Sequence, residues 1–544
     1  MNKKIEELTL ELASIRGVVG TKEENHVVEK VYEKFMNMNY FKYHPDMVKY
    51  VYIKDDKLKR KSVLAMVKGE KSSSNKTVIL IGHTDTVGIS DYGNLMEYAA
   101  NPLELTKKLN EVTLPDDAAK DLESGEYIFG RGIFDMKCGV ATLMTLVETI
   151  SDDVENFEGN IVFAAVCDEE GNSGGMLSVV PELLKLREKE NFDYLAVIDT
   201  DYSAPRYDGD DTRYVYVGTV GKLMPTFYIV GSEAHGGDPF KGIDPNQIAG
   251  AITNEINLNT KYSDIAEGEV CVPPITLRQQ DLKTEYSVQT ARTSYLYFNY
   301  GTHISTPDQV MEKVIDGANL AFQNVIDSLN AEYRKYCNLS GFPYEKLPWK
   351  ARVMPYEKLY NLVKKEKGEE VDKLIDDLNE KLLDDPNIDE RMFALKIVEE
   401  IHKMWSDKDP VVIVYFSPPY YPHIYVEGKN PLEEKLLNTV NEIVENTESK
   451  YDIEVKKFYP YISDLSYAAA PKETDAVDSL KSNMPGFGVK YSLPIEEMQK
   501  LNLPVVNIGP FGKDAHKFTE RLQKDYSFNI APKLVYDTII NLLK

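Results

Sequence analysis

The stretch TVILIGHTD, residues 77–85, decides the fold class of this chain. Its apolar run lacks the polar alternation of a half-exposed strand, which indicates a strand buried on both faces of a largely parallel sheet. The run ends by presenting His83 and Asp85. Open α/β sheets bind their ligands at the carboxyl ends of such strands. The histidine and the aspartate are therefore candidate functional residues.

Further motifs repeat this arrangement of an apolar run followed by polar side chains. They are NIVFAAV (160–166) before Glu169 and Glu170, DYLAVI (193–198) before Asp199, LPVVNI (503–508) before the loop with His516, and the glycine-punctuated loop GRGIFDMKCG (130–139) with Asp135. Each motif alone fits a structural role equally well, as a turn histidine, a helix cap or a solvated acidic turn. Together they supply enough ligands for two cations that share one carboxylate.

The residue types suggest distinct roles in such a site. In an H-x-D motif the histidine binds metal through one ring nitrogen while a nearby carboxylate orients the ring, a role that suits Asp85. Asp135 is the candidate bridging carboxylate, which holds two ions roughly 3.5–4 Å apart. Adjacent carboxylates allow Glu170 to bind metal while Glu169 faces water and acts as the base.

Length and pattern predict more than one domain, because single hydrophobic cores stop growing well before 544 residues. Residues 1–211 alternate helices with buried strands and predict the first part of an α/β catalytic domain, whose sheet is completed by residues 425–544. Residues 212–424 predict an inserted βαββαβ domain. A helix-like, charge-rich extension of this insert covers about 331–408.

Composition excludes several classes of function. The 63 basic and 88 acidic side chains give a net charge of -25, which opposes binding to nucleic acid. No apolar run approaches the roughly 20 residues of a membrane helix, and the charged N-terminus is unlike a signal peptide. The 4 cysteines are widely spaced and form no C-x-x-C, so they predict neither a disulfide framework nor a zinc ribbon. We expect a cytoplasmic protein that does not associate with membranes.

The ordered set of motifs resembles the M20 metallopeptidase family. The matching segments are HTD (83–85), GRGIFDMKCG (130–139), DEEGNSGG (168–175), an acidic residue at 199 and DAHKFTE (514–520). The resemblance implies a zinc-peptidase-like catalytic domain with a mainly parallel central sheet, plus an inserted lid and dimerisation domain.

The same resemblance implies a role for each candidate residue. One ion would be bound by His83, Asp135 and Asp199, with Asp201 as the alternative to Asp199, and the other by Asp135, Glu170 and His516. Glu169 would be the general base, Asp85 would orient His83, and Glu520 would lie just outside the ligands. The ions would be zinc, with cobalt or manganese as alternatives.

The inserted domain carries a further resemblance. GSEAHGGDP (231–239) is similar to the family's lid motif, which implies that His235 polarises the scissile carbonyl and, in a homodimer, reaches the partner's site. DYGNLMEYAANPLEL (91–105) and the long lid extension resemble the family's arginine-utilisation branch.

The implied function is hydrolysis of an amide or peptide bond in a small peptide or N-acyl amino acid. The competing hypothesis is a non-catalytic metal- or amino-acid-binding protein on the same fold. Glu169 favours the hydrolase, because a binding protein has no need of a base beside two metals.

Overall fold

The computed structural model describes residues 1–385 and 387–544, which divide into two compact units. Unit 1 comprises Met1–Thr219, Ile424–Ala470 and Pro494–Lys544, and unit 2 comprises Val220–His423 and Pro471–Leu493. Each unit has its own sheet and is described separately.

Unit 1 is built on a nine-stranded sheet with the order β1-β2-β5-β3-β6-β18-β7-β16, in which β17 also pairs with β7. The central strands β5, β3, β6 and β18 run parallel, and the pairs β1-β2, β2-β5, β18-β7 and β7-β16 are antiparallel. The apolar run that opens at residue 77 lies in β3, where every residue from Thr77 to His83 is buried. The predicted α/β fold class with a mainly parallel centre is confirmed.

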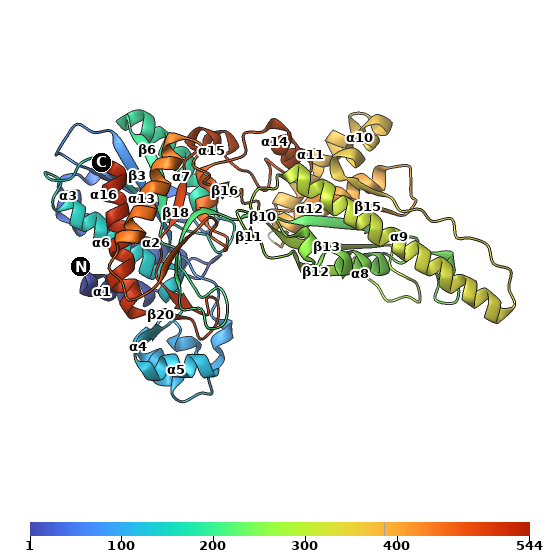
Figure 1. The fold of residues 1–544 in the computed structure, drawn as a ribbon. Coiled ribbons are helices and arrows are strands. Elements are labelled where there is room, and N and C mark those ends of the chain that lie inside the picture. Colours follow the sequence, from blue (N-terminus) through green and yellow to red (C-terminus); the bar gives the residue numbers. More distant parts are fainter. Residues whose placement is uncertain (386) are drawn as a thin grey trace. The chain divides into compact units, whose positions relative to one another are not determined.

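Helices pack around this sheet and supply its core contacts (Figure 1). α6 and α16 both contact β3, whereas α7 contacts β1, β2 and β5. The strands of unit 1 are β1 (Val48–Tyr52), β2 (Lys61–Lys68), β3 (Lys76–His83), β4 (Tyr127–Phe129), β5 (Asn160–Val166), β6 (Asp193–Asp199), β7 (Arg213–Thr219), β16 (Ile424–Tyr425), β17 (Ile453–Lys456), β18 (Val505–Asn507), β19 (Gly512–Lys513) and β20 (Arg521–Gln523). Its helices are α1 (Asn2–Ala13), α2 (Glu24–Asn37), α3 (Asn39–Tyr43), α4 (Pro102–Leu109), α5 (Asp116–Ser124), α6 (Cys138–Ser151), α7 (Gly174–Glu190), α13 (Pro431–Asn446), α15 (Ile495–Leu501) and α16 (Ala531–Leu543).

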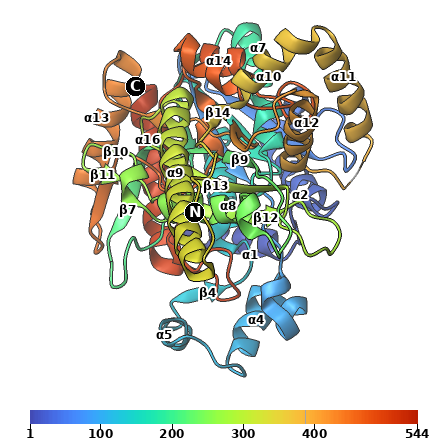
Figure 2. The same cartoon turned by 90° about the vertical axis from the view of Figure 1, so that its right-hand side faces the viewer.

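A protrusion of unit 1, formed by residues 88–126 with α4 and α5, stands away from the main sheet in both views (Figures 1 and 2). It has a small core of its own, in which Leu105, Leu109 and Ala118 pack with Phe129 of β4. β4 pairs with β20, and β20 pairs with β19 in a separate three-stranded sheet. The protrusion is therefore connected to the segment that carries His516.

Unit 2 contains the βαββαβ pattern, with the sheet order β12-β13-β9-β15-β14 and β8 paired to β13. Its strands are β8 (Gly221–Leu223), β9 (Pro225–Val230), β10 (Ile265–Ala266), β11 (Glu269–Val270), β12 (Ile275–Asp281), β13 (Thr293–Thr302), β14 (Val353–Pro355) and β15 (Val411–Phe416). Its helices are α8 (Pro245–Ile256), α9 (Pro307–Ser340), α10 (Tyr356–Lys367), α11 (Glu370–Leu383), α12 (Glu390–Met404) and α14 (Thr474–Ser482).

Local sequence explains the length of α9. Thr306 and Gln309 form a capping box around Pro307 at the first turn, and Gly341 ends the helix in a left-handed conformation. At 34 residues the helix is about 51 Å long. The predicted helical extension, 331–408, contains its last turns with α10, α11 and α12, and residue 386 of that range lies outside the described residues.

Apart from a one-residue shift at Ile424, the compact units differ in two respects from the predicted domains, whose boundaries lie at 211/212 and 424/425. Residues 212–219 belong to unit 1, because β7 pairs with β18 in the sheet of that unit. Residues 471–493 pack with unit 2, although the sequence assigns them to the C-terminal part of the catalytic domain. The reason is tertiary, because α14 packs on α9 and the Asn483 carbonyl accepts the Phe416 N–H at 2.7 Å. Within the described residues, no helix has the length and apolarity that crossing a membrane requires.

Candidate metal centre

Parallel strand pairing brings the predicted residues to one edge of the unit 1 sheet. His83 is the last residue of β3 and Asp199 the last residue of β6, and β3 lies between β5 and β6. The turn with Glu169 and Glu170 follows β5. Because these three strands run parallel, their carboxyl ends meet at the edge where α/β sheets bind ligands.

Asp135 lies between two histidines at this edge. Its Oδ1 is 3.1 Å from His83 Nε2, and its Oδ2 is 2.9 Å from His516 Nε2. His516 Nε2 is also 3.1 Å from Glu170 Oε1. Two sets of ligand atoms, each within 4.8 Å of one another, share Asp135: His83, Asp135 and Asp201, and Asp135, Glu170 and His516. The donors therefore fit two divalent cations bridged by one carboxylate.

The structure brings Asp201, rather than the predicted Asp199, into the first set. The two Asp199 oxygens accept hydrogen bonds from the Thr200 N–H at 2.7 Å and from Ser463 Oγ at 2.9 Å. The sequence favours Asp199 because it directly ends the apolar run. Thr200 and Ser463 thus hold the Asp199 carboxylate, whereas the side chain of Asp201, two residues further along the chain, lies with His83 and Asp135.

Glu169 and Asp85 are buried beside His83. Glu169 is 9% exposed, and its Oε2 is 3.9 Å from His83 Nε2. The Asp85 carboxylate accepts the N–H groups of Glu169 at 3.2 Å and of Glu170 at 3.0 Å. His83 Nδ1 is 3.1 Å from the Asp85 carbonyl oxygen but 3.8 Å from its carboxylate. Asp85 thus contacts the histidine most closely through its backbone and fixes the acidic turn through its side chain.

Burial opposes the charge of each carboxylate in this cluster. It raises the pKa of Asp201, to which the nearby Asp135 adds, and it raises the pKa of Glu169 despite the opposing effect of His83. Burial acts in the same direction on Asp135, but hydrogen bonds from His516 and His83 outweigh it and hold the pKa of Asp135 below its usual range. At His516, contacts with Asp135 and Glu170 outweigh the effect of burial and raise the pKa to about 10. The buried carboxylates of the cluster outnumber its two histidines, so the histidines alone cannot balance their negative charge. Bound cations would supply the missing positive charge.

Asp464 is a buried acid beside the cluster that the motif analysis does not identify. It is 3% exposed, and it lines a small cavity together with His83, Glu169 and Asp201. Burial raises its pKa well above the usual range. No apolar strand precedes Asp464 in the sequence, so only the fold reveals its position.

A second ionic network supports the acidic turn from the protein interior. Glu24 is fully buried, and its carboxylate accepts the Asp168 N–H at 3.0 Å and the Gly20 N–H at 2.7 Å. Arg60 pairs with Asp168 and, at 3.1 Å, with Asp56. Because Asp168 precedes Glu169, this network fixes the start of the turn that presents the predicted base.

His235 lies in unit 2 and is exposed. Its Nδ1 accepts the Gly237 N–H at 3.0 Å, and its backbone bridges to Gln289. In the tautomer that accepts this bond at Nδ1, Nε2 carries the proton and is the hydrogen-bond donor of the ring.

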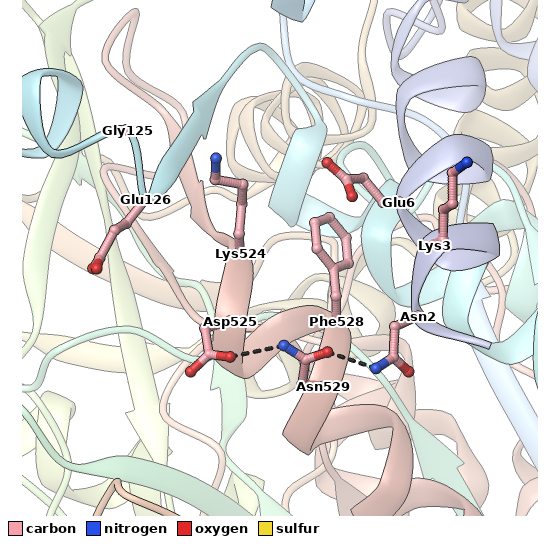
Figure 3. Close-up of a pocket in the computed structure, with 9 residues that line it drawn as sticks. All are labelled: Asn2, Lys3, Glu6, Gly125, Glu126, Lys524, Asp525, Phe528 and Asn529. Carbon is pink, nitrogen blue, oxygen red and sulfur yellow. Dashed lines mark hydrogen bonds between the residues drawn. The ribbon is translucent and has the colours of Figure 1, made fainter.

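A separate hollow on unit 1 contains none of the predicted residues. Charged and amide side chains surround Phe528, and Asn529 accepts from Asn2 at 2.6 Å and donates to Asp525 at 2.7 Å (Figure 3). This hollow is therefore distinct from the metal-ligand cluster.

Comparison with known proteins agrees with the fold and the cluster. Residues 79–541 match the model of Peptidase family M20/M25/M40, and the chain belongs to this family. It is an M20-type hydrolase, and the family resemblance seen in its motifs is confirmed.

Individual relatives extend the match over the full chain. Protein RocB of Bacillus subtilis (strain 168) is 35% identical over 544 residues, which cover 100% of this chain and 95% of that protein. Uncharacterized protein YqjN of the same organism is 33% identical, over 99% of this chain and 96% of that protein. Among solved structures, aminopeptidase PepT from Bacillus cereus ATCC 10987 has a TM-score of 0.52 at 13% identity, covering 100% of this chain and 99% of that chain. This last likeness concerns the fold alone.

Proposed function

We propose that this chain is a two-metal hydrolase that cleaves an amide or peptide bond in a small amino-acid-derived substrate. The observation that carries the proposal is the position of Asp135, whose two oxygens lie 3.1 and 2.9 Å from His83 Nε2 and His516 Nε2. One carboxylate between two histidine nitrogens, with further acids on both sides, suits a shared ligand of two cations.

The proposed ligands follow the two sets of donor atoms. His83, Asp135 and Asp201 would hold one ion, and Asp135, Glu170 and His516 the other. Imidazole and carboxylate donors are compatible with zinc, cobalt and manganese. We propose zinc first, as the resemblance to the family implies, with cobalt or manganese as alternatives. When bound, such ions activate water and polarise a carbonyl.

Glu169 is proposed as the general base. Its carboxylate lies beside His83, and its backbone N–H donates to Asp85 at 3.2 Å. The backbone from which the side chain extends is therefore held in place. It would accept a proton from the attacking water and deliver one to the leaving amine. The Glu169 and Glu170 N–H groups both donate to the Asp85 carboxylate, which fixes the backbone of the proposed base relative to that of the proposed ligand.

Metal analysis of variants tests this assignment. The purified protein should hold up to two divalent ions, and Asp135→Ala and His516→Ala should lower that number. Asp201→Asn should weaken metal binding more than Asp199→Asn, which serves as the matched control. Unchanged stoichiometry in both alanine variants would overturn the proposed site.

The proposed substrates are small peptides or N-acyl amino acids. Resemblance to the arginine-utilisation branch makes arginine-containing dipeptides and N-acyl arginines the first compounds to assay beside a general panel. Metal-dependent release of an amine from any of these supports the hydrolase. Metal binding without hydrolysis across the panel would favour the alternative, a non-catalytic metal- or amino-acid-binding protein.

We also propose a homodimer in which His235 completes the partner's site. Two features of unit 2 support this: His235 is exposed, and the edge strand β12 leaves Ile275 and Leu277 41% and 48% exposed. Exposed apolar side chains on an unpaired edge strand favour pairing with another chain. Mixing inactive His235→Ala and Glu169→Ala subunits should restore partial activity, and no recovery after confirmed subunit exchange would refute the shared site.

A cytoplasmic location is the remaining part of the proposal. All four cysteines are described, and each is buried and free of a disulfide. Reduced cysteines are typical of a reducing compartment. Fractionation of cells that express the full-length protein would test this expectation.

A further inference from the structure

Arg521 of β20 is a fully buried arginine whose guanidinium joins two segments of unit 1, α5 and the loop at 514–519. Its Nη2 donates to Asp117 at 2.7 Å and its Nε donates to Asp121 at 2.7 Å, and both of these acids belong to α5 of the protrusion. Its Nη1 donates to Asp514 and to the Thr519 carbonyl at 3.1 Å. The protrusion and the loop that carries His516 are thus connected through one side chain.

The loop at 514–519 needs such support. Asp514 and His516 have φ values of 60° and 65°, in the left-handed region that L residues with side chains seldom adopt. Such conformations persist only where the surroundings determine them. The Asp514 carboxylate supplies part of that determination, because it also accepts from Thr519 Oγ1 at 2.8 Å and from Lys517 Nζ at 3.0 Å.

Arg521 in turn depends on α5. A guanidinium with no exposed surface needs carboxylate partners, because an unpaired buried charge is costly. α5 supplies two of its three carboxylates, and Asp121 also accepts from Lys513 Nζ at 2.9 Å. Without these acids, Asp514 alone would have to compensate Arg521, and its hold on the loop would change.

We propose that α5 fixes the His516 loop through Arg521, and that Asp117 and Asp121 are positioning residues for the metal ion bound at His516. The inference rests on the proposed function. Neither aspartate belongs to the donor sets around Asp135, so both would act only through Arg521 and the loop. A displaced His516 would bind its ion more weakly, whereas the set containing His83 would be unaffected.

The test is a metal titration of apo protein carrying Asp117→Asn and Asp121→Asn together. With Co²⁺ alone as the probe, we expect one of the two ions to bind roughly 10–100-fold more weakly, the usual effect of losing a residue that supports a ligand. The other ion should bind as in the wild type. Asp116→Asn is the matched control, because Asp116 is an exposed acid on the same helix.

A second variant covers the case in which the double variant fails to fold. Arg521→Lys keeps the buried charge but loses the planar, multidentate geometry of the guanidinium. It should therefore weaken the binding of the same ion. Circular dichroism confirms that each variant is folded. Two unchanged affinities in a folded variant would overturn the inference. A wild-type protein that binds no metal would instead overturn the proposed function, so the two failures are distinguishable.

Discussion

Replacing Glu169 with glutamine is the sharpest test of the proposed chemistry. The change is nearly isosteric, and the backbone bond from the Glu169 N–H to Asp85 Oδ1 at 3.2 Å does not depend on the side chain. The neighbouring ligand, Glu170, keeps its contact with His516 at 3.1 Å. The variant should therefore retain the cluster while removing the proton acceptor.

The magnitude follows from the role. A positioned acid–base group contributes roughly 10²–10⁴-fold, which is about 3–5 kcal/mol of barrier at 1.36 kcal/mol per tenfold. Stability should not fall, because burial opposes the charge of Glu169 and the acids Asp464, Glu170 and Asp201 add repulsion. A neutral amide relieves both effects, so we expect an unchanged or higher Tm.

The assay combines three measurements on one preparation: kcat on a substrate that the wild type cleaves, metal content, and Tm. Glu170→Gln is the control, because loss of a ligand should lower metal content as well as rate. Near-normal turnover of Glu169→Gln would remove Glu169 from its role. Loss of metal from that variant would show that the base and the ligand have been exchanged.

Three further perturbations follow from the structure. Chelation should lower the Tm, and Zn²⁺ at about 100 times its Kd should restore about 2.7 kcal/mol per site, whereas a Tm indifferent to metal would contradict a folded metal cluster. Burial, aided by Lys408, lowers the pKa of His402 to about 4, so the unfolded state takes up its proton first and stability is lost as pH falls from about 6.5 toward 4. Between pH 7 and pH 5 this proton uptake should lower the free energy of unfolding of the wild type by about 2 kcal/mol, a loss that His402→Phe should not show. Urea unfolding followed by tryptophan fluorescence measures the difference. The ring centroid of Phe240 lies 4.9 and 5.4 Å from those of two tyrosines of α9, Tyr333 and Tyr336. Each such pair contributes about 0.5–1.5 kcal/mol, so Phe240→Ala should loosen the segment that follows His235. We expect kcat to fall roughly tenfold, the equivalent of about 1.4 kcal/mol. An equal fall in the control Leu339→Ala, whose side chain is 89% exposed, would refute that reasoning.

Strand-end residues of the candidate site were predictable because one local pattern encodes them. An apolar run gives a buried strand, and parallel strands bring their carboxyl ends together, so His83 and the acidic pair at 169–170 could be placed without a structure. The distinction between Asp199 and Asp201 was not accessible in this way. It depends on Ser463, which is 264 positions away in the chain and reaches Asp199 only after folding.

The supporting residues escaped prediction for the same physical reason. Glu24, Arg60 and Arg521 carry no periodic signal, and each acts through partners far along the chain, such as Asp168, 144 positions from Glu24. Residues 471–493 likewise join unit 2 through packing on α9 and not through any composition change. Contacts of this range are set by topology, which a local pattern does not contain.

The distribution of buried charge explains how unit 1 separates structural acids from candidate ligands. Three buried or largely buried arginines each pair with acids next to a ligand segment: Arg60 with Asp168 before the acidic turn, Arg131 with Glu520 at 2.7 Å before Asp135, and Arg521 with Asp514 beside His516. In the described part of the chain, no lysine or arginine ion pair is found for Asp135, Glu170 or Asp201. Fixed cations thus hold the loops, while the acids that face the centre depend on histidine. Since burial makes uncompensated carboxylates costly, binding of divalent ions would stabilise the site that those loops form.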